Sequence, residues 1–182
     1  MNRTRIPKIL AVLSAVVIAV AIPAVNLHGE TMYVEVIDES ANGDGTLLRL
    51  VVPSIIFGPD AGEFGGIDPG TTETNDTILG RIAEVLNRFE GYSIRIEGHA
   101  NPTTPPGTEL RAEEETGSPN ILGLQPLSEE RAQTVLEHLV DLGVERDRLS
   151  AVGMGGARVL VEYEDRDDWW RNRRVEFLLT RK

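Results

Sequence analysis

Three stretches of this sequence decide its fold: Gly98-His99-Ala100-Asn101, Leu127-Ser128-Glu129-Glu130-Arg131-Ala132 and Asn172-Arg173-Arg174-Val175. The first follows Ser93 to Glu97, whose alternation predicts a strand that ends at a polar turn. The second opens a run of apolar residues at helical spacing, and Ser128 is a good N-cap, so a helix is predicted to begin there. The third opens a further predicted strand, Val175 to Leu179. Strands that alternate with helices in this way favour helices packed on one sheet.

In this order the three stretches resemble the OmpA-like domain, the peptidoglycan-binding carboxyl-terminal module of the OmpA and MotB family. The resemblance covers about Ile55 to Lys182. It implies an α+β fold, a βαβαβ sandwich of helices packed on one mixed sheet, here with an amino-terminal strand hairpin. It also implies a binding protein and not an enzyme, since the motifs offer no nucleophile with an adjacent base.

The resemblance also implies a ligand, the diaminopimelate residue of a peptidoglycan stem peptide. Arg131 matches the family arginine that holds a carboxylate, with backbone N–H groups at the helix start, near Ser128, assisting it. Asn101 stands where the family has an aspartate, so here an amide faces the amine. A charge-assisted bond of roughly 1.5–3 kcal/mol becomes a neutral one of about 0.5–1.5 kcal/mol. The resulting loss of affinity is about five- to tenfold.

Further candidate residues flank these two. His99 either borders the site or packs beside the sheet edge, and with no second histidine or cysteine nearby neither a metal nor a cofactor is expected. Either one of Arg173 and Arg174 pairs with Asp167 or Asp168 while the other borders the pocket, or both arginines have a structural role. The pair Trp169-Trp170 is expected to cover the sheet, with stacking on a carbohydrate as the alternative.

One segment departs from the family pattern. Residues 102–126 hold five prolines and are predicted to be a long inserted loop at the rim of the pocket. Asn120 or Arg111 of this loop are further candidates for ligand contact, and Leu124 stands where relatives usually carry asparagine. A diamino acid that lacks the second carboxylate would be less mismatched with a neutral Asn101, so the identity of the diamino acid stays open.

The chain divides into three predicted units. Residues 1–29 are a signal peptide or a signal anchor, in which three basic residues precede an almost unbroken apolar run, residues 9–25. That run of about 17 residues lies between a cleaved signal core and the roughly 20 needed to span a bilayer, so both outcomes remain open. Residues 30–54 are a strand hairpin or linker, and residues 55–182 are the OmpA-like domain.

Composition limits the partners. The formal net charge is −11, and without the three basic residues of the signal it is about −14, which makes nucleic acid a poor partner. The chain has no cysteine, so it carries neither a disulfide nor a lipidated cysteine, and membrane attachment would run through residues 9–25 if they are uncleaved. The expected partners are the stem peptide and other envelope proteins. The expected location is the periplasm or cell envelope, either membrane-anchored or associated with the outer membrane.

Two other classes of function stay in view. A membrane-anchored motor or scaffold component would use the same module for protein contacts. A proton-driven motor needs an ionisable group within its membrane helix, and residues 9–25 contain none. A cell-wall hydrolase would release soluble fragments from sacculi, which a binding protein does not do.

Overall fold

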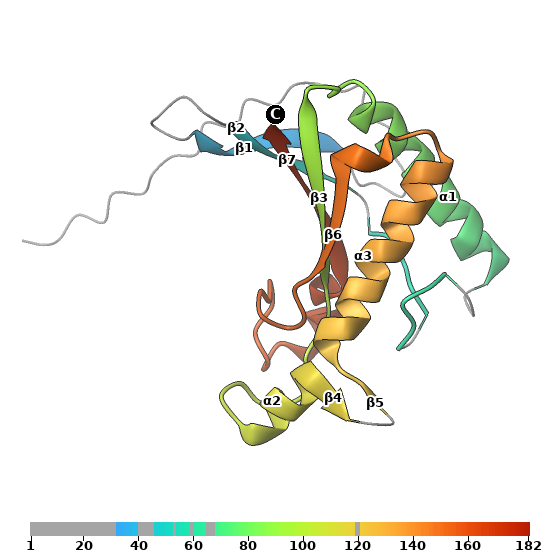
Figure 1. Cartoon of the computed structure of the whole chain (residues 1–182). Coiled ribbons are helices and arrows are strands. Elements are labelled where there is room, and N and C mark those ends of the chain that lie inside the picture. The colour runs from blue at the N-terminus through green and yellow to red at the C-terminus, as the bar shows by residue number, and fades with distance from the viewer. Residues whose placement is uncertain (1–31, 40–45, 53, 59, 65–67, 119–120) are drawn as a thin grey trace, which may run out of the picture.

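The computed structural model describes residues 32–39, 46–52, 54–58, 60–64, 68–118 and 121–182, so the predicted signal segment lies outside the described residues. The described residues form two layers, with two long helices on one face of a twisted sheet (Figure 1). No helix in these ranges is both long enough and apolar enough to span a membrane.

The main sheet of the described residues has five strands in the order β1-β2-β7-β3-β6. Their bounds are β1 Tyr33–Glu39, β2 Thr46–Val51, β3 Tyr92–His99, β6 Leu149–Gly153 and β7 Arg174–Arg181. β3 and β6 run parallel, and the other neighbours are antiparallel. The predicted hairpin is β1 and β2, and it extends the sheet through β7. The predicted mixed sheet covered by helices is therefore confirmed.

The two long helices, α1 (Pro69–Leu86) and α3 (Leu124–Asp141), close the core over the sheet. Each helix buries an apolar face, and every second residue of the central strands points toward that face. Burial of a leucine- or phenylalanine-sized side chain stabilises the fold by about 1.5–3 kcal/mol. The largest fully buried apolar side chains are Phe177, Leu50, Leu79, Ile82, Leu86, Ile94, Ile96, Leu139 and Leu179.

The helix that carries Arg131 begins one turn earlier than predicted. Ser128 is not its N-cap, because α3 begins at Leu124 and Gly123 is the cap residue. Pro126 lies in the first turn, where a missing N–H removes no helical hydrogen bond, so the proline does not end the helix. Arg131 is consequently two turns into α3, and the expectation that first-turn N–H groups lie beside it is wrong.

The segment predicted to be a loop, residues 102–126, contains regular structure. It holds α2 (Glu109–Thr116) and a short antiparallel pair, β4 (Gly117–Ser118) and β5 (Ile121–Leu122). α2 buries none of its residues, so it lacks the apolar spacing by which a helix is recognised in sequence. Its N-cap is Thr108, whose side chain accepts a hydrogen bond from the Arg111 N–H at 3.2 Å.

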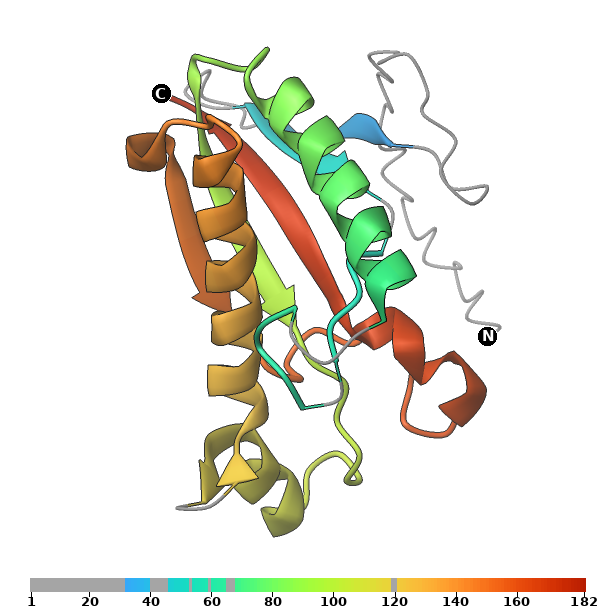
Figure 2. The ribbon, with the colours of Figure 1, turned by 90° about the vertical axis from the view of Figure 1, so that its right-hand side faces the viewer.

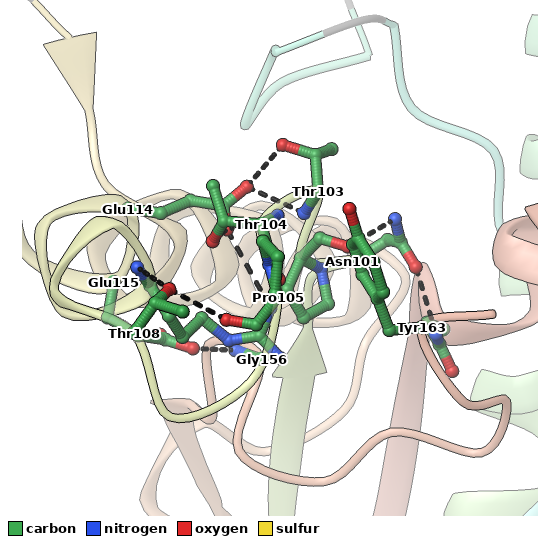
Figure 3. A network of polar contacts seen from close by, with 12 residues as sticks. Asn101, Thr103, Thr104, Pro105, Thr108, Glu114, Glu115, Gly156 and Tyr163 are labelled. Carbon is green, nitrogen blue, oxygen red and sulfur yellow. Dashed lines mark hydrogen bonds and ion pairs between the residues drawn. The ribbon is translucent and has the colours of Figure 1, made fainter.

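Hydrogen bonds fasten this insertion to the rest of the domain (Figure 3). The Glu114 carboxylate accepts from the backbone N–H groups of Thr103, at 2.7 Å, and Thr104, at 3.1 Å, and from both threonine hydroxyls. The Glu115 carboxylate accepts from the Gly156 N–H at 2.8 Å. Carboxylates that accept several such bonds hold a segment in one position. The Glu114 contacts therefore hold the insertion together internally, and the Glu115 contact joins it to the turn after β6.

Candidate functional site

A cleft of about 1000 Å³ opens on the helical side of the domain, and it is the candidate functional site. Its walls come from the segment after β2, the start of α1, the chain after β3, the first half of α3 and the 3-10 helix η2 (Arg166–Asn172). Acidic, basic, hydroxyl and aromatic side chains share these walls. The polar and aromatic members are Ser54, Phe57, Asp60, Asp68, Thr71, Thr74, Asn101, Thr103, Arg131, Trp169, Trp170 and Arg173.

Arg131 lines this cleft and is only 5% exposed. Its Nε donates to the Ala61 carbonyl oxygen at 2.9 Å, and its guanidinium carbon lies 5.2 Å from the centre of the Phe57 ring. The hydrogen bond and the cation–π contact fix the plane of the guanidinium. Within the described ranges no acidic side chain forms a salt bridge with it. Its terminal nitrogens are thus held in place for a ligand.

The electrostatic surroundings of Arg131 favour an anion. Burial lowers the pKa of its guanidinium below the ordinary value, and the nearby Arg173 lowers it further, while Asp60 acts in the opposite direction. An arginine nevertheless stays protonated in proteins. A buried positive charge that lacks a close counter-ion is costly, so a bound carboxylate at this position is favourable.

Asp60 is a cleft residue that sequence reasoning missed. It lies in a glycine- and proline-rich stretch with no helical or strand pattern, and its φ of 51° places it in the left-handed region that aspartate tolerates. It is exposed, and among the described residues it forms no salt bridge. Its effect on Arg131 depends on the tertiary fold, so no local signal reveals it.

Asn101 lines the same cleft, and its side chain is tied to the protein on both sides. Its Oδ1 accepts from Asn172 Nδ2 at 2.9 Å, and its Nδ2 donates to the Pro102 carbonyl oxygen at 3.0 Å. Asn172 in turn accepts from the N–H groups of Leu160 and Val161. The first and third sequence stretches are therefore joined, and the Asn101 amide oxygen keeps only its second lone pair for a ligand.

Ser128 holds α3 against the sheet and does not line the cleft. Its hydroxyl donates to the Gln125 carbonyl oxygen and accepts from the Gly155 N–H, both at 2.8 Å. The approach of the helix is close, because a Cβ atom at Gly98 would lie 2.0 Å from the Ser128 carbonyl oxygen. Glycine at this position therefore lets α3 reach the end of β3 and brings Arg131 near Asn101.

His99 and Arg174 lie on the opposite face of the sheet. Side chains alternate along a strand, and because Gly98 faces α3, His99 faces away from it. Arg174 is paired with His99 across the ladder, and its Nε donates to Glu176 at 2.6 Å instead of to the Asp167-Asp168 pair. Of the predicted site residues, the described cleft brings together Asn101, Arg131 and Arg173.

Arg111, a site candidate of the predicted loop, does not line the described cleft. Arg111 donates to the Thr104 carbonyl oxygen at 2.9 Å and lies 3.7 Å from Glu114, so it serves the insertion itself. Asn120 lies outside the described residues. Leu124, which stands where asparagine is usual, lines the cleft with an apolar side chain.

The sheet face behind the cleft carries three side chains with metal-ligand chemistry, Glu97, His99 and Glu176, whose ligand atoms lie within 4.8 Å of one another. Burial, followed by the Arg174 charge, lowers the pKa of His99 to about 4. Each carboxylate is already paired with two arginines: Arg95 and Arg158 for the first, Arg174 and Arg49 for the second. Four guanidinium groups around two carboxylates oppose the binding of a divalent cation.

The chain belongs to the OmpA family, because residues 68–173, more than half of its length, match that family. It is similar to the peptidoglycan-binding protein ArfA of Mycobacterium bovis, with 26% identity over 139 residues, 76% of this chain and 37% of ArfA. It is also similar to the peptidoglycan-associated lipoprotein of Mesorhizobium japonicum, with 32% identity over 99 residues, 54% of this chain and 50% of that protein. The chain thus spans half or less of these curated relatives.

Solved structures show the same fold. The periplasmic domain of Helicobacter pylori MotB aligns with a TM-score of 0.59 and 20% identity, over 86% of each chain. The OmpA-like domain of FopA1 from Francisella tularensis aligns with a TM-score of 0.51 and 19% identity, over 82% of this chain and 80% of that one. At these identities the likeness concerns the fold alone.

Proposed function

We propose that this protein binds peptidoglycan non-covalently in the cell envelope, by holding the diamino acid of a stem peptide in the cleft. The observation that carries the proposal is Arg131, a buried cation with no salt-bridge partner among the described residues, fixed at the wall of a cleft. Support also comes from two similar proteins, one named a peptidoglycan-binding protein and the other a peptidoglycan-associated lipoprotein.

The ligand carboxylate is expected at the guanidinium of Arg131. The Nε atom is used by the Ala61 carbonyl, so the two terminal nitrogens make the contact, and a charge-assisted pair of this kind is among the stronger hydrogen bonds. Arg173 lines the same cleft and adds positive potential there, and it is not expected to make a second fixed contact with the ligand carboxylate. The start of α3 lies two turns from Arg131, so its N–H groups are not expected to assist the carboxylate that Arg131 holds.

The ligand amine is expected to face Asn101, with Asp60 supplying the negative charge. Asn101 offers only one free lone pair, because its amide oxygen already accepts from Asn172. Asp60 lines the same cleft, and its carboxylate carries the charge that an aspartate at position 101 would have carried. The ammonium and the carboxylate of one ligand would then face the Asp60 carboxylate and the Arg131 guanidinium in one cleft. This charge pattern is complementary to a zwitterionic amino acid.

Export follows from the predicted signal in residues 1–29, whether it is cleaved or kept as an anchor. The periplasm or cell envelope is where the proposed ligand is found. The described domain would then act as the cell-wall contact, while other envelope proteins remain proposed partners.

The test is co-sedimentation with purified sacculi. We expect the wild type to pellet and Arg131→Ala to lose about 10- to 100-fold in affinity, the equivalent of one charge-assisted contact. Arg146→Ala is the matched control, because this exposed arginine pairs with Glu137 at the surface, away from the cleft. It should pellet like the wild type. Circular dichroism checks that each variant folds.

Two outcomes oppose the proposal. If the wild type stays in the supernatant, or if Arg131→Ala pellets as well as the wild type, the cleft is not the peptidoglycan site. Release of soluble fragments from the sacculi by pure protein would indicate a hydrolase instead.

A further inference from the structure

Both tryptophans of the chain lie at the cleft and not over the sheet. Trp169 and Trp170 belong to η2, which lies beyond the end of the sheet and near the start of α1 in the view of Figure 2, and both side chains line the cleft. Trp170 is 48% exposed. The expectation that these residues cover the sheet is therefore wrong. A large aromatic surface left open beside a binding cleft is typical of a contact surface.

The segment that presents Trp170 is braced. The Trp169 ring lies 5.6 Å from the Tyr163 ring, and the Arg166 guanidinium lies over both, at 5.3 Å and 5.4 Å from their centres. Arg166 Nη2 also donates to the Tyr163 hydroxyl at 3.1 Å. Since these contacts are present without a ligand, little further ordering is needed when one binds.

Trp170 is also linked by structure to the proposed peptide site. The Arg173 N–H donates to the Trp170 carbonyl oxygen at 3.1 Å, so the cleft arginine follows directly in the same turn. Arg173 acts electrostatically on Arg131. Asn172, between them in sequence, is bonded to Asn101. The exposed indole and the proposed peptide contacts are therefore parts of one continuous surface.

We propose that Trp170 is a stacking platform for a sugar ring of the glycan strand, so that the protein binds the saccharide and the stem peptide together. This inference rests on the proposed function. A pyranose ring presents a face of C–H groups that packs on an indole, and its hydroxyls stay in water at the rim. Two peptide residues separate the sugar-bound lactyl group from the diamino acid, a span of about 10 Å. A sugar of the same repeating unit therefore lies within about 10 Å of the diamino acid that is proposed to contact Arg131.

The test compares two soluble ligands by calorimetry: the free stem peptide, and the same peptide attached to its disaccharide. For the wild type we expect the disaccharide to raise affinity about three- to tenfold, the usual size of an aromatic stacking contribution. Trp170→Ala should lose the advantage of the disaccharide, so that it binds the two ligands with about equal affinity. Trp170→Phe should keep part of it.

Leu160→Ala is the matched control, since Leu160 is an exposed apolar side chain, 57% exposed, that does not line the described cleft. Both of its affinities should equal those of the wild type. If the wild type binds both ligands equally, or if Trp170→Ala keeps the full advantage, the sugar platform is ruled out while peptide binding stands. If the wild type binds neither ligand, the proposed function fails, and the inference fails with it.

Discussion

Two arginines are buried among the residues that the structure describes, Arg131 and Arg148, and their hydrogen-bond donors are satisfied very differently. Arg148 is 3% exposed, and it donates to the carbonyl oxygens of Tyr92 at 3.2 Å, Leu86 at 2.9 Å and Phe89 at 2.6 Å. It therefore ties the carboxyl-terminal end of α1 and the turn after it to the start of β3, as a second donor to the Leu86 and Phe89 carbonyls. Arg131, at 5% exposed, has one carbonyl partner and an aromatic ring.

Burial alone therefore does not distinguish a structural arginine from one that we propose binds a ligand. What distinguishes them is how many of the five N–H donors the protein itself uses. Arg148 donates three hydrogen bonds to backbone carbonyls, whereas Arg131 donates one through Nε and has its terminal nitrogens available for a ligand. Replacement of Arg148 should therefore mainly lower the stability of the fold, whereas replacement of Arg131 should mainly weaken ligand binding.

The largest expected effect is on folding. Arg148→Ala removes three hydrogen bonds to backbone carbonyl oxygens, although those of Leu86 and Phe89 still accept from backbone N–H groups, so we expect it to lower the free energy of unfolding by about 3 kcal/mol. Arg131→Ala should change it by about 1 kcal/mol or less, because one hydrogen bond is lost together with an unpaired buried charge. Urea denaturation at pH 7 measures both. Equal losses for the two variants would contradict the comparison.

The sheet face behind the cleft carries His99, whose lowered pKa makes the stability of the fold depend on pH. The pKa of His99 is lowered from 6.5 to about 4 by burial and by Arg174, and both ring nitrogens lack hydrogen-bond partners in the described structure. Between these values the unfolded chain binds a proton that the folded chain does not, so stability falls as pH falls. We expect a loss on the order of 2 kcal/mol between pH 7.5 and pH 5.

Burial sets the sign of this effect, and most of the charged groups that face His99 act in the same direction. Arg49 from β2, Arg158 from the turn after β6, and Arg174 from β7 oppose a charged histidine, and Glu176 only partly offsets them. The pKa of Glu176 is itself lowered, so its contribution is lost only as pH falls below 4.5, in the same direction. For His99→Asn, the free energy of unfolding measured between pH 7.5 and pH 5 should depend less steeply on pH than that of the wild type. An unchanged slope would exclude His99 as the titrating group.

The smallest expected effect concerns where the negative charge of the cleft lies. Asp60→Asn should weaken binding of a stem peptide with a free amine about five- to tenfold and leave binding of the amine-acetylated peptide unchanged. Asn101→Asp should strengthen binding of the free-amine peptide modestly, at a cost in stability, since its carboxylate cannot donate to the Pro102 carbonyl. Calorimetry with the two peptides measures both changes. If Asp60→Asn affects both peptides equally, Asp60 is not the partner of the amine.

Sequence alone predicted the sheet and its covering helices, because apolar alternation and helical spacing are local patterns. It missed α2, none of whose residues is buried, because the sequence of this helix has no apolar residues at helical spacing. It also misplaced the start of α3, because Pro126 was read as a loop residue although the first helical turn tolerates proline.

The site was predicted in part for the same kind of reason. Arg131 and Asn101 stand in motifs and do line the cleft. His99 was grouped with them through adjacency in sequence, but β3 continues to residue 99, and strand alternation turns that side chain to the other face. Asp60 joins the cleft through the tertiary approach of its loop to α3, which no pattern in the chain announces.

The Asn101–Asn172 hydrogen bond lies where β3 ends and β7 is about to begin. These two strands are neighbours near the middle of the sheet, and their antiparallel ladder has eight residue pairs. Because the hydrogen bond ties both strands at the same end of this ladder, a mechanical pull on a ligand that contacts Asn101 reaches the two strands together.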